Sequence, residues 1–165
     1  MTRKALSVKS ISFDLLKGLD EAHDIVLPFS WPSPTFAGPS IPNSPAAKES
    51  EYCHAMVHRL EGPNLGELGM HGYDNACFWF GRTGYHRLFP EVQRRSIEIA
   101  KEYKDAEKYI SKISKGDWNP DDFTLLCKNA LAEDDRDMWD YCNRVTNMEW
   151  NLLFQECNKI VNPIK

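Results

Sequence analysis

Apolar side chains recur every three or four residues over most of this chain, which is the spacing of one face of an α-helix. The alternation of apolar and polar residues that is typical of half-buried strands is nowhere convincing. The pattern predicts six helices, over residues 12–24, 46–61, 74–82, 90–112, 119–132 and 135–160. The expected fold is therefore all-α, a single compact bundle of about six helices that forms one domain over residues 1–165.

Specific residues mark where some of these helices begin. Asn119 offers a capping side chain, Pro120 suits the first helical position, and the two aspartates that follow complement the helix dipole. Pro90 has the same N-terminal role for the long, charged helix over 90–112. The last predicted helix carries an apolar stripe made of Trp139, Cys142, Val145, Leu152 and Leu153.

Residues 28–45 interrupt the helical pattern. Six of the ten prolines lie in this stretch, and proline lacks the N–H group that a helix interior or a central strand needs. The stretch also contains Phe29, Trp31, Phe36 and Ile41. A disordered linker would be poor in such side chains, so we predict a long, ordered, proline-rich loop that packs on the helices.

Composition narrows the class of protein. The chain has 165 residues, of which 42% are hydrophobic and 27% charged, as expected for one globular domain. The net charge of −4 argues against a nucleic-acid partner, and no apolar run is long enough to span a membrane. The five cysteines form no C-x-x-C pair and no signal peptide is evident, which favours a cytoplasmic protein with reduced thiols. The oligomeric state stays open.

Histidines supply the candidate chemistry. His54 and His58 are four residues apart in a predicted helix, so both imidazoles lie on one face and could bind one metal ion. His23 lies on the apolar face of the first predicted helix, where a polar ring needs a partner, and His86 follows a glycine-rich turn. These four side chains are the candidate ligands of a divalent transition metal, zinc first, with iron or copper as alternatives.

Two glutamates are candidate catalytic groups. Glu61 extends the face of His54 and His58 by one turn, and Glu149 interrupts the apolar stripe of the last predicted helix. A buried carboxylate needs a cation, a donor or a metal, so either glutamate could be the fourth ligand or the general base. For Glu149 the simpler partner is an arginine, and three are available: Arg59, Arg82 and Arg144.

Aromatic residues suggest where a substrate would bind. Trp79 lies in an aromatic run that is more often part of a core, but it could line a pocket with Trp31 from the proline-rich loop. Arg82, one turn after Trp79, completes the candidate substrate pocket.

Three stretches of the chain resemble a family of small bacterial and fungal proteins without an assigned activity. Residues 52–61 contain its H-x-x-x-H-R-x-E pattern, residues 73–82 are similar to its D-x-N-A-x-Y-W-F-x-R pattern, and residues 84–86 match its G-x-H pattern. Residues 20–23, 117–123 and 149–150 are similar to its flanking parts. The chain departs from the family at Cys53 and Phe78, and residues 64–72, which include His71, look like an insertion. The resemblance implies that one group of residues belongs together: His23, His54, His58, His86 and Glu149.

Two functions from different classes fit these observations. The first is a small metal-dependent enzyme, a lyase, hydrolase or isomerase, that acts on a small organic substrate through a His/Glu site. The second is a non-catalytic helical module that binds a ligand or a protein, with the histidines in a structural polar core. Loss of bound metal on substitution of His54 or His58, with the fold retained, would distinguish the first from the second.

Overall fold

The computed structural model describes residues 12–41, 44–63, 72–114 and 116–161, and these residues fold into seven α-helices. The helices are α1 (Ser12–Ser30), α2 (Ala47–Glu61), α3 (Gly72–Thr83), α4 (Phe89–Ala100), α5 (Ala106–Ile113), α6 (Pro120–Ala132) and α7 (Arg136–Val161). Within the described ranges there is no β-strand, only an isolated bridge between Thr35 and Gly38. The all-α prediction is therefore confirmed.

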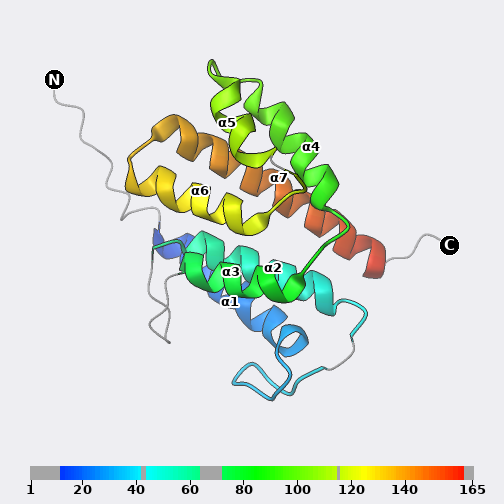
Figure 1. Ribbon diagram of the computed structural model, residues 1–165. Coiled ribbons are helices and arrows are strands. Elements are labelled where there is room, and N and C mark those ends of the chain that lie inside the picture. Colours follow the sequence, from blue (N-terminus) through cyan, green and yellow to red (C-terminus); the bar gives the residue numbers. More distant parts are fainter. Residues whose placement is uncertain (1–11, 42–43, 64–71, 115, 162–165) are drawn as a thin grey trace.

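The helices are arranged in two groups (Figure 1). In the first group α2 packs against both α1 and α3, and in the second α4 and α6 pack against α7 while α5 lies against α4 and α6. Contacts of α3 with α6 and of α2 with α7 join the two groups. None of the helices, as far as the structure describes them, is long and apolar enough to cross a membrane.

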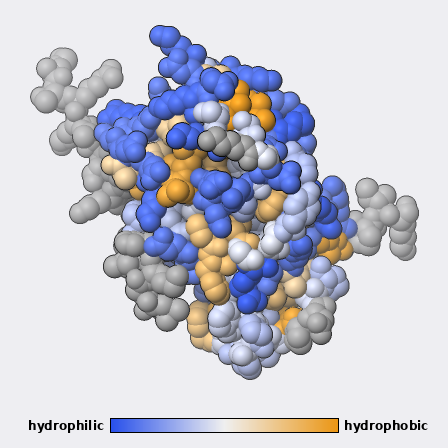
Figure 2. Space-filling model, in the orientation of Figure 1, coloured by the Kyte–Doolittle hydropathy of each residue, from blue (hydrophilic) through white to orange (hydrophobic). Residues whose placement is uncertain are grey.

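The core lies where the two groups of helices meet. Its largest fully buried apolar side chains come from three helices, α2, α6 and α7: Tyr52, Met56, Phe123, Tyr141 and Leu153. Hydrophilic side chains cover most of the face shown in Figure 2, with apolar patches between them. The burial of these large side chains supplies the main favourable term for folding, at about 1.5–3 kcal/mol each.

The prediction of one helix over residues 90–112 is wrong, because residues 101–105 interrupt it and separate α4 from α5. No glycine or proline marks the break. The turn between α4 and α5 allows α5 to bury Tyr109 and Ile113. Tyr109 then packs against Tyr141, with ring centroids 4.9 Å apart. The side chain of Gln93 on α4 donates to the Ile113 carbonyl over 3.0 Å, which satisfies an otherwise free group at the end of α5.

The first helix is longer than the pattern predicts, because α1 continues through Pro28 to Ser30. Pro28 lies in the last turn, where its missing N–H removes only one bond of the helix. Burial of Val26 and Leu27 favours this extra turn. The proline-rich loop therefore begins later, and two bonds hold it: Ile41 N–H donates to the Pro28 carbonyl (2.8 Å), and the Ser40 hydroxyl donates to the Trp31 carbonyl (2.8 Å).

The last two helices begin and end close to the predicted positions. The Asn119 side chain accepts from the backbone N–H groups of Asp121 and Asp122, at 2.9 and 3.3 Å, which confirms the predicted cap of α6. The predicted stripe on α7 needs one correction, since Trp139 is exposed while Met138 is buried in its place. Residues 64–71, with His71, lie outside the described residues.

Candidate metal site

Three of the four candidate histidines lie together where α1 packs against α2. One ring nitrogen of each of His23, His54 and His58 lies within 4.8 Å of those of the other two. The His54 and His58 rings stack with centroids 4.8 Å apart, as expected for one helix face. The His23 ring meets both edge-on, at 4.6 and 5.3 Å. The structure therefore adds His23 to the pair that the spacing predicted.

His54 offers a free lone pair inside the protein. The side chain is 1% exposed, and its Nδ1 lies 2.9 Å from the Ser30 hydroxyl oxygen. When that hydroxyl donates to the Val26 carbonyl (3.0 Å), it accepts from a protonated Nδ1 of His54. The other nitrogen, Nε2, is then an acceptor, and it has no hydrogen-bond partner among the described residues. A ring held through one nitrogen, with the other free, is the arrangement in which histidine binds metals.

His58 is held in the same way by a carboxylate. Its Nδ1 lies 2.7 Å from Oε2 of Glu61, and since a carboxylate only accepts, Nδ1 carries the proton. Nε2 keeps its lone pair, which lies 3.1 Å from the side-chain nitrogen of Asn75 on α3. Asn75 therefore donates to the nitrogen that a metal would use, and it would have to move aside for a metal to bind there.

His23 is the adaptable member of the group. Its side chain is partly exposed, and Nδ1 lies 3.6 Å from Oδ1 of Asp24. A tetrahedral shell with Zn–N distances near 2.0 Å brings ligand nitrogens to about 3.3 Å from one another. The three nitrogens lie within 4.8 Å of one another, so binding an ion would require the rings to move closer, and the partly exposed His23 has the most room to move.

The surroundings keep His54 neutral. Burial, followed by the neighbouring His58, His23 and Arg82, lowers the pKa of His54 from 6.5 to about 2. A neutral imidazole is the form that binds a metal, so His54 is ready to do so at any physiological pH.

This shift predicts that the metal-free protein loses stability in mild acid. Below pH 6.5 the unfolded chain protonates His54 while the folded chain does not, so the unfolded state binds more protons and stability falls as the pH falls. We expect the free energy of unfolding to drop by about 1.4 kcal/mol per pH unit from this side chain, or about 2 kcal/mol between pH 6.5 and 5.0. Urea denaturation in the presence of a chelator, repeated at several pH values, measures this.

His54→Gln is the control for this prediction, because it removes the titrating group from both states. The pH dependence should become weaker without vanishing, since burial also lowers the pKa of His86. A wild-type stability that stays flat from pH 6.5 to 5.0 would contradict the assignment.

The three residues expected in a substrate pocket lie beside His54. The Trp79 ring stacks on the His54 ring at 3.7 Å, and Trp31 packs edge-on against Trp79 at 5.8 Å. The Arg82 guanidinium lies over both indole rings, 5.2 Å from Trp79 and 5.9 Å from Trp31. It also donates to the Ser30 carbonyl and to Glu51, both at 3.1 Å. The loop, α3 and the histidine group therefore form one continuous cluster.

His86 and Glu149 are not part of this group. The Nδ1 atom of His86 accepts from the Leu88 N–H (3.2 Å), and its Nε2 lies 3.7 Å from Glu49. Glu149 is fully buried and accepts from the Tyr52 hydroxyl (2.5 Å) and from the guanidinium of Arg59. The partner of Glu149 is thus an arginine, and its position does not support a role as ligand or general base.

Two residues of the site have no counterpart in the sequence interpretation. Ser30 orients His54 but lies beyond the predicted end of the first helix. Asn75 reaches His58 from a neighbouring helix, and only the tertiary packing of α2 against α3 brings the two together. Comparisons of the chain with models of protein families, with curated proteins and with solved structures found no match.

Proposed function

We propose that this protein is a metal-dependent enzyme that holds a divalent transition metal, zinc first, between His23, His54 and His58. One observation carries the proposal: the buried Nε2 atom of His54 has no partner among the described residues, in a ring that Ser30 fixes from the other side. Leaving a buried acceptor unsatisfied costs about 1–3 kcal/mol. A cation bound to that nitrogen, and shared with the His23 and His58 rings, would remove that cost.

Three histidine ligands leave a fourth position open, as in catalytic zinc sites. A metal there would supply an activated water or polarise a substrate carbonyl, which suits hydrolysis, elimination or isomerisation. Iron or copper remain the alternative ions, since imidazole suits them too. Glu61 is assigned a positioning role, because its carboxylate fixes the orientation of His58.

The neighbouring aromatic cluster supports a small organic substrate. Trp31 and Trp79 offer an apolar wall beside His54, and Arg82 places a positive charge on the same wall. We infer that the substrate has a planar or apolar part, which packs on this wall, and one anionic group, which binds the guanidinium of Arg82. From the composition and the cysteine pattern we propose that the protein acts in the cytoplasm. We also propose that the family whose motifs the chain resembles has the same metal site.

Metal content tests the proposal. After incubation with zinc and removal of excess ion, inductively coupled plasma mass spectrometry should find about one metal per chain. Alanine at His23, His54 or His58 should each reduce this to near zero, while circular dichroism shows an unchanged helical content. His86→Gln, a histidine outside the group, is the matched control and should keep its metal.

An empty wild-type chain that also fails to take up zinc, iron or copper would overturn the metal site. The chain would then be a non-catalytic helical module with a structural polar core, a reading that the bonds of His58 to both Glu61 and Asn75 favour. In that case His58→Ala should lower the free energy of unfolding by about 1–3 kcal/mol, without any change in metal content.

A further inference from the structure

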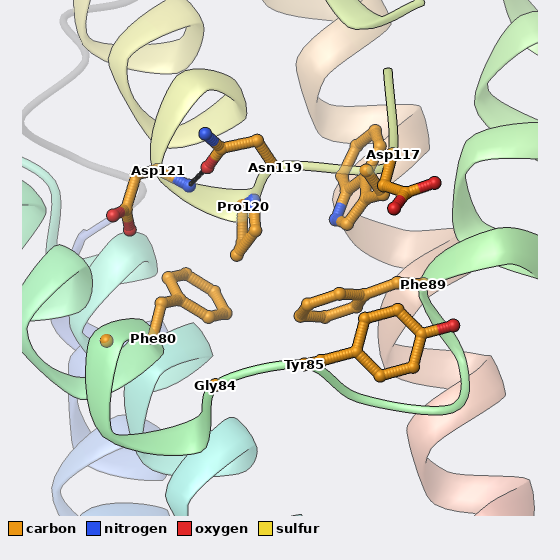
Figure 3. A pocket seen from close by; sticks show the side chains of 10 residues that line it. Phe80, Gly84, Tyr85, Phe89, Asp117, Asn119, Pro120 and Asp121 are labelled. Atoms are coloured by element: carbon orange, nitrogen blue, oxygen red, sulfur yellow. Dashed lines mark hydrogen bonds between the residues drawn. The ribbon is translucent and has the colours of Figure 1, made fainter.

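A cavity of about 340 Å³ lies between the end of α3 and the start of α6, and none of the proposed metal ligands lines it. Four aromatic side chains contribute to its walls: Phe80, Tyr85, Phe89 and Trp118. Figure 3 shows the Phe80 and Phe89 rings facing a common gap below Pro120, with the Tyr85 ring beside Phe89. Tyr85 is exposed, while the other three aromatic side chains are buried, so Tyr85 forms the outer wall.

The charges around this cavity are all negative. Asp117 and Asp121 lie on opposite sides of it in Figure 3, and the described residues that line it include no basic side chain. Burial, together with the charge of Asp122, raises the pKa of Asp121, a sign that no cation neutralises it. The Asn119 side chain already occupies the first N–H groups of α6, so the helix does not offer them to an anion.

We propose that this cavity binds a small methylated ammonium ion, for which choline is the probe. Aromatic faces attract such a cation through their negative π-surface, and the two carboxylates add a favourable field. A metal ion is a poor fit, since the aspartates lie on opposite sides and aromatic rings separate them.

Calorimetric titration of the full chain with choline and with 3,3-dimethylbutan-1-ol tests the charge requirement. The alcohol has the same shape as choline but carries no charge. We expect saturable binding of choline, at least about tenfold tighter than that of the alcohol. Equal binding of the two would show an apolar cavity only, and no binding of choline at about 10 mM would exclude the site; either result overturns the proposal.

Substitutions then locate the site. Tyr85→Leu changes an exposed side chain and should weaken choline binding at least about fivefold, whereas Phe154→Leu, at an equally exposed aromatic residue of α7, should leave it unchanged. If Tyr85→Leu binds choline as tightly as the wild type, choline binds elsewhere and the proposal fails.

Discussion

Glu149→Gln should lower the free energy of unfolding by about 3–5 kcal/mol, more than any substitution on the surface of this protein. The substitution keeps the shape of the side chain and its bond to the Tyr52 hydroxyl, but it removes the charge that faces Arg59. Arg59 is 4% exposed, and its Nε and Nη1 atoms have no other partner among the described residues. The guanidinium would then be buried without a counter-ion, against the Phe80 and Phe123 rings.

Urea denaturation followed by tryptophan fluorescence measures the effect. The double variant Arg59→Met/Glu149→Leu should lose much less stability than the two single variants added together, because an apolar pair needs no compensation. Asp74→Asn breaks the exposed pair with Lys128 and should cost less than about 1 kcal/mol. A cost for Glu149→Gln as small as that of Asp74→Asn would mean that the buried pair is not needed for stability.

Gly72→Ala should destabilise the protein by about 3 kcal/mol or more. A Cβ atom at this position would lie 2.5 Å from the His58 carbonyl oxygen and 2.9 Å from the Gly62 backbone nitrogen. Both are backbone atoms at the end of α2, so neither can turn away, and α3 would have to separate from α2. The displaced turn includes His58 and Glu61, so we also expect weaker metal binding.

Gly81→Ala is the matched control, at the other end of the same helix. Nothing lies within 4 Å of a Cβ atom built there, and alanine favours a helix over glycine by about 0.5–1 kcal/mol. Thermal unfolding should therefore show a lower midpoint for Gly72→Ala and an equal or higher one for Gly81→Ala. If the two variants had the same unfolding midpoint, the close approach of α3 to α2 would not restrict position 72 to glycine.

The fold could be predicted from the sequence where local signals agree with packing. For α6, the Asn119 cap and Pro120 coincide with an apolar period, and the helix begins where they indicate. The break between α4 and α5 could not be predicted, because residues 101–105 contain no helix-breaking residue and the turn is favoured by burial of Tyr109 and Ile113. Tertiary contacts decide such a boundary, and they leave no local pattern.

The candidate site likewise contains some residues that local sequence patterns predict and others that only tertiary packing decides. The four-residue spacing placed His54 and His58 on one face, and the apolar surroundings of His23 correctly marked it as a ring in need of partners. The residue type of His86 and the family resemblance group it with these histidines, but the chain path takes it to Glu49 instead. No pattern within one segment could have excluded it, because that outcome depends on how separate helices pack.

The position of α1 has a consequence for how a metal would enter and leave. This helix packs mainly on α2, and it alone carries His23. Local opening of α1 would withdraw one ligand and uncover the buried Nε2 of His54, while the remaining helices keep their shared core. Metal binding and docking of α1 on α2 would therefore be thermodynamically linked. A bound ion would slow hydrogen exchange of the backbone amides of α1, and release of the ion would require only that α1 separate from α2.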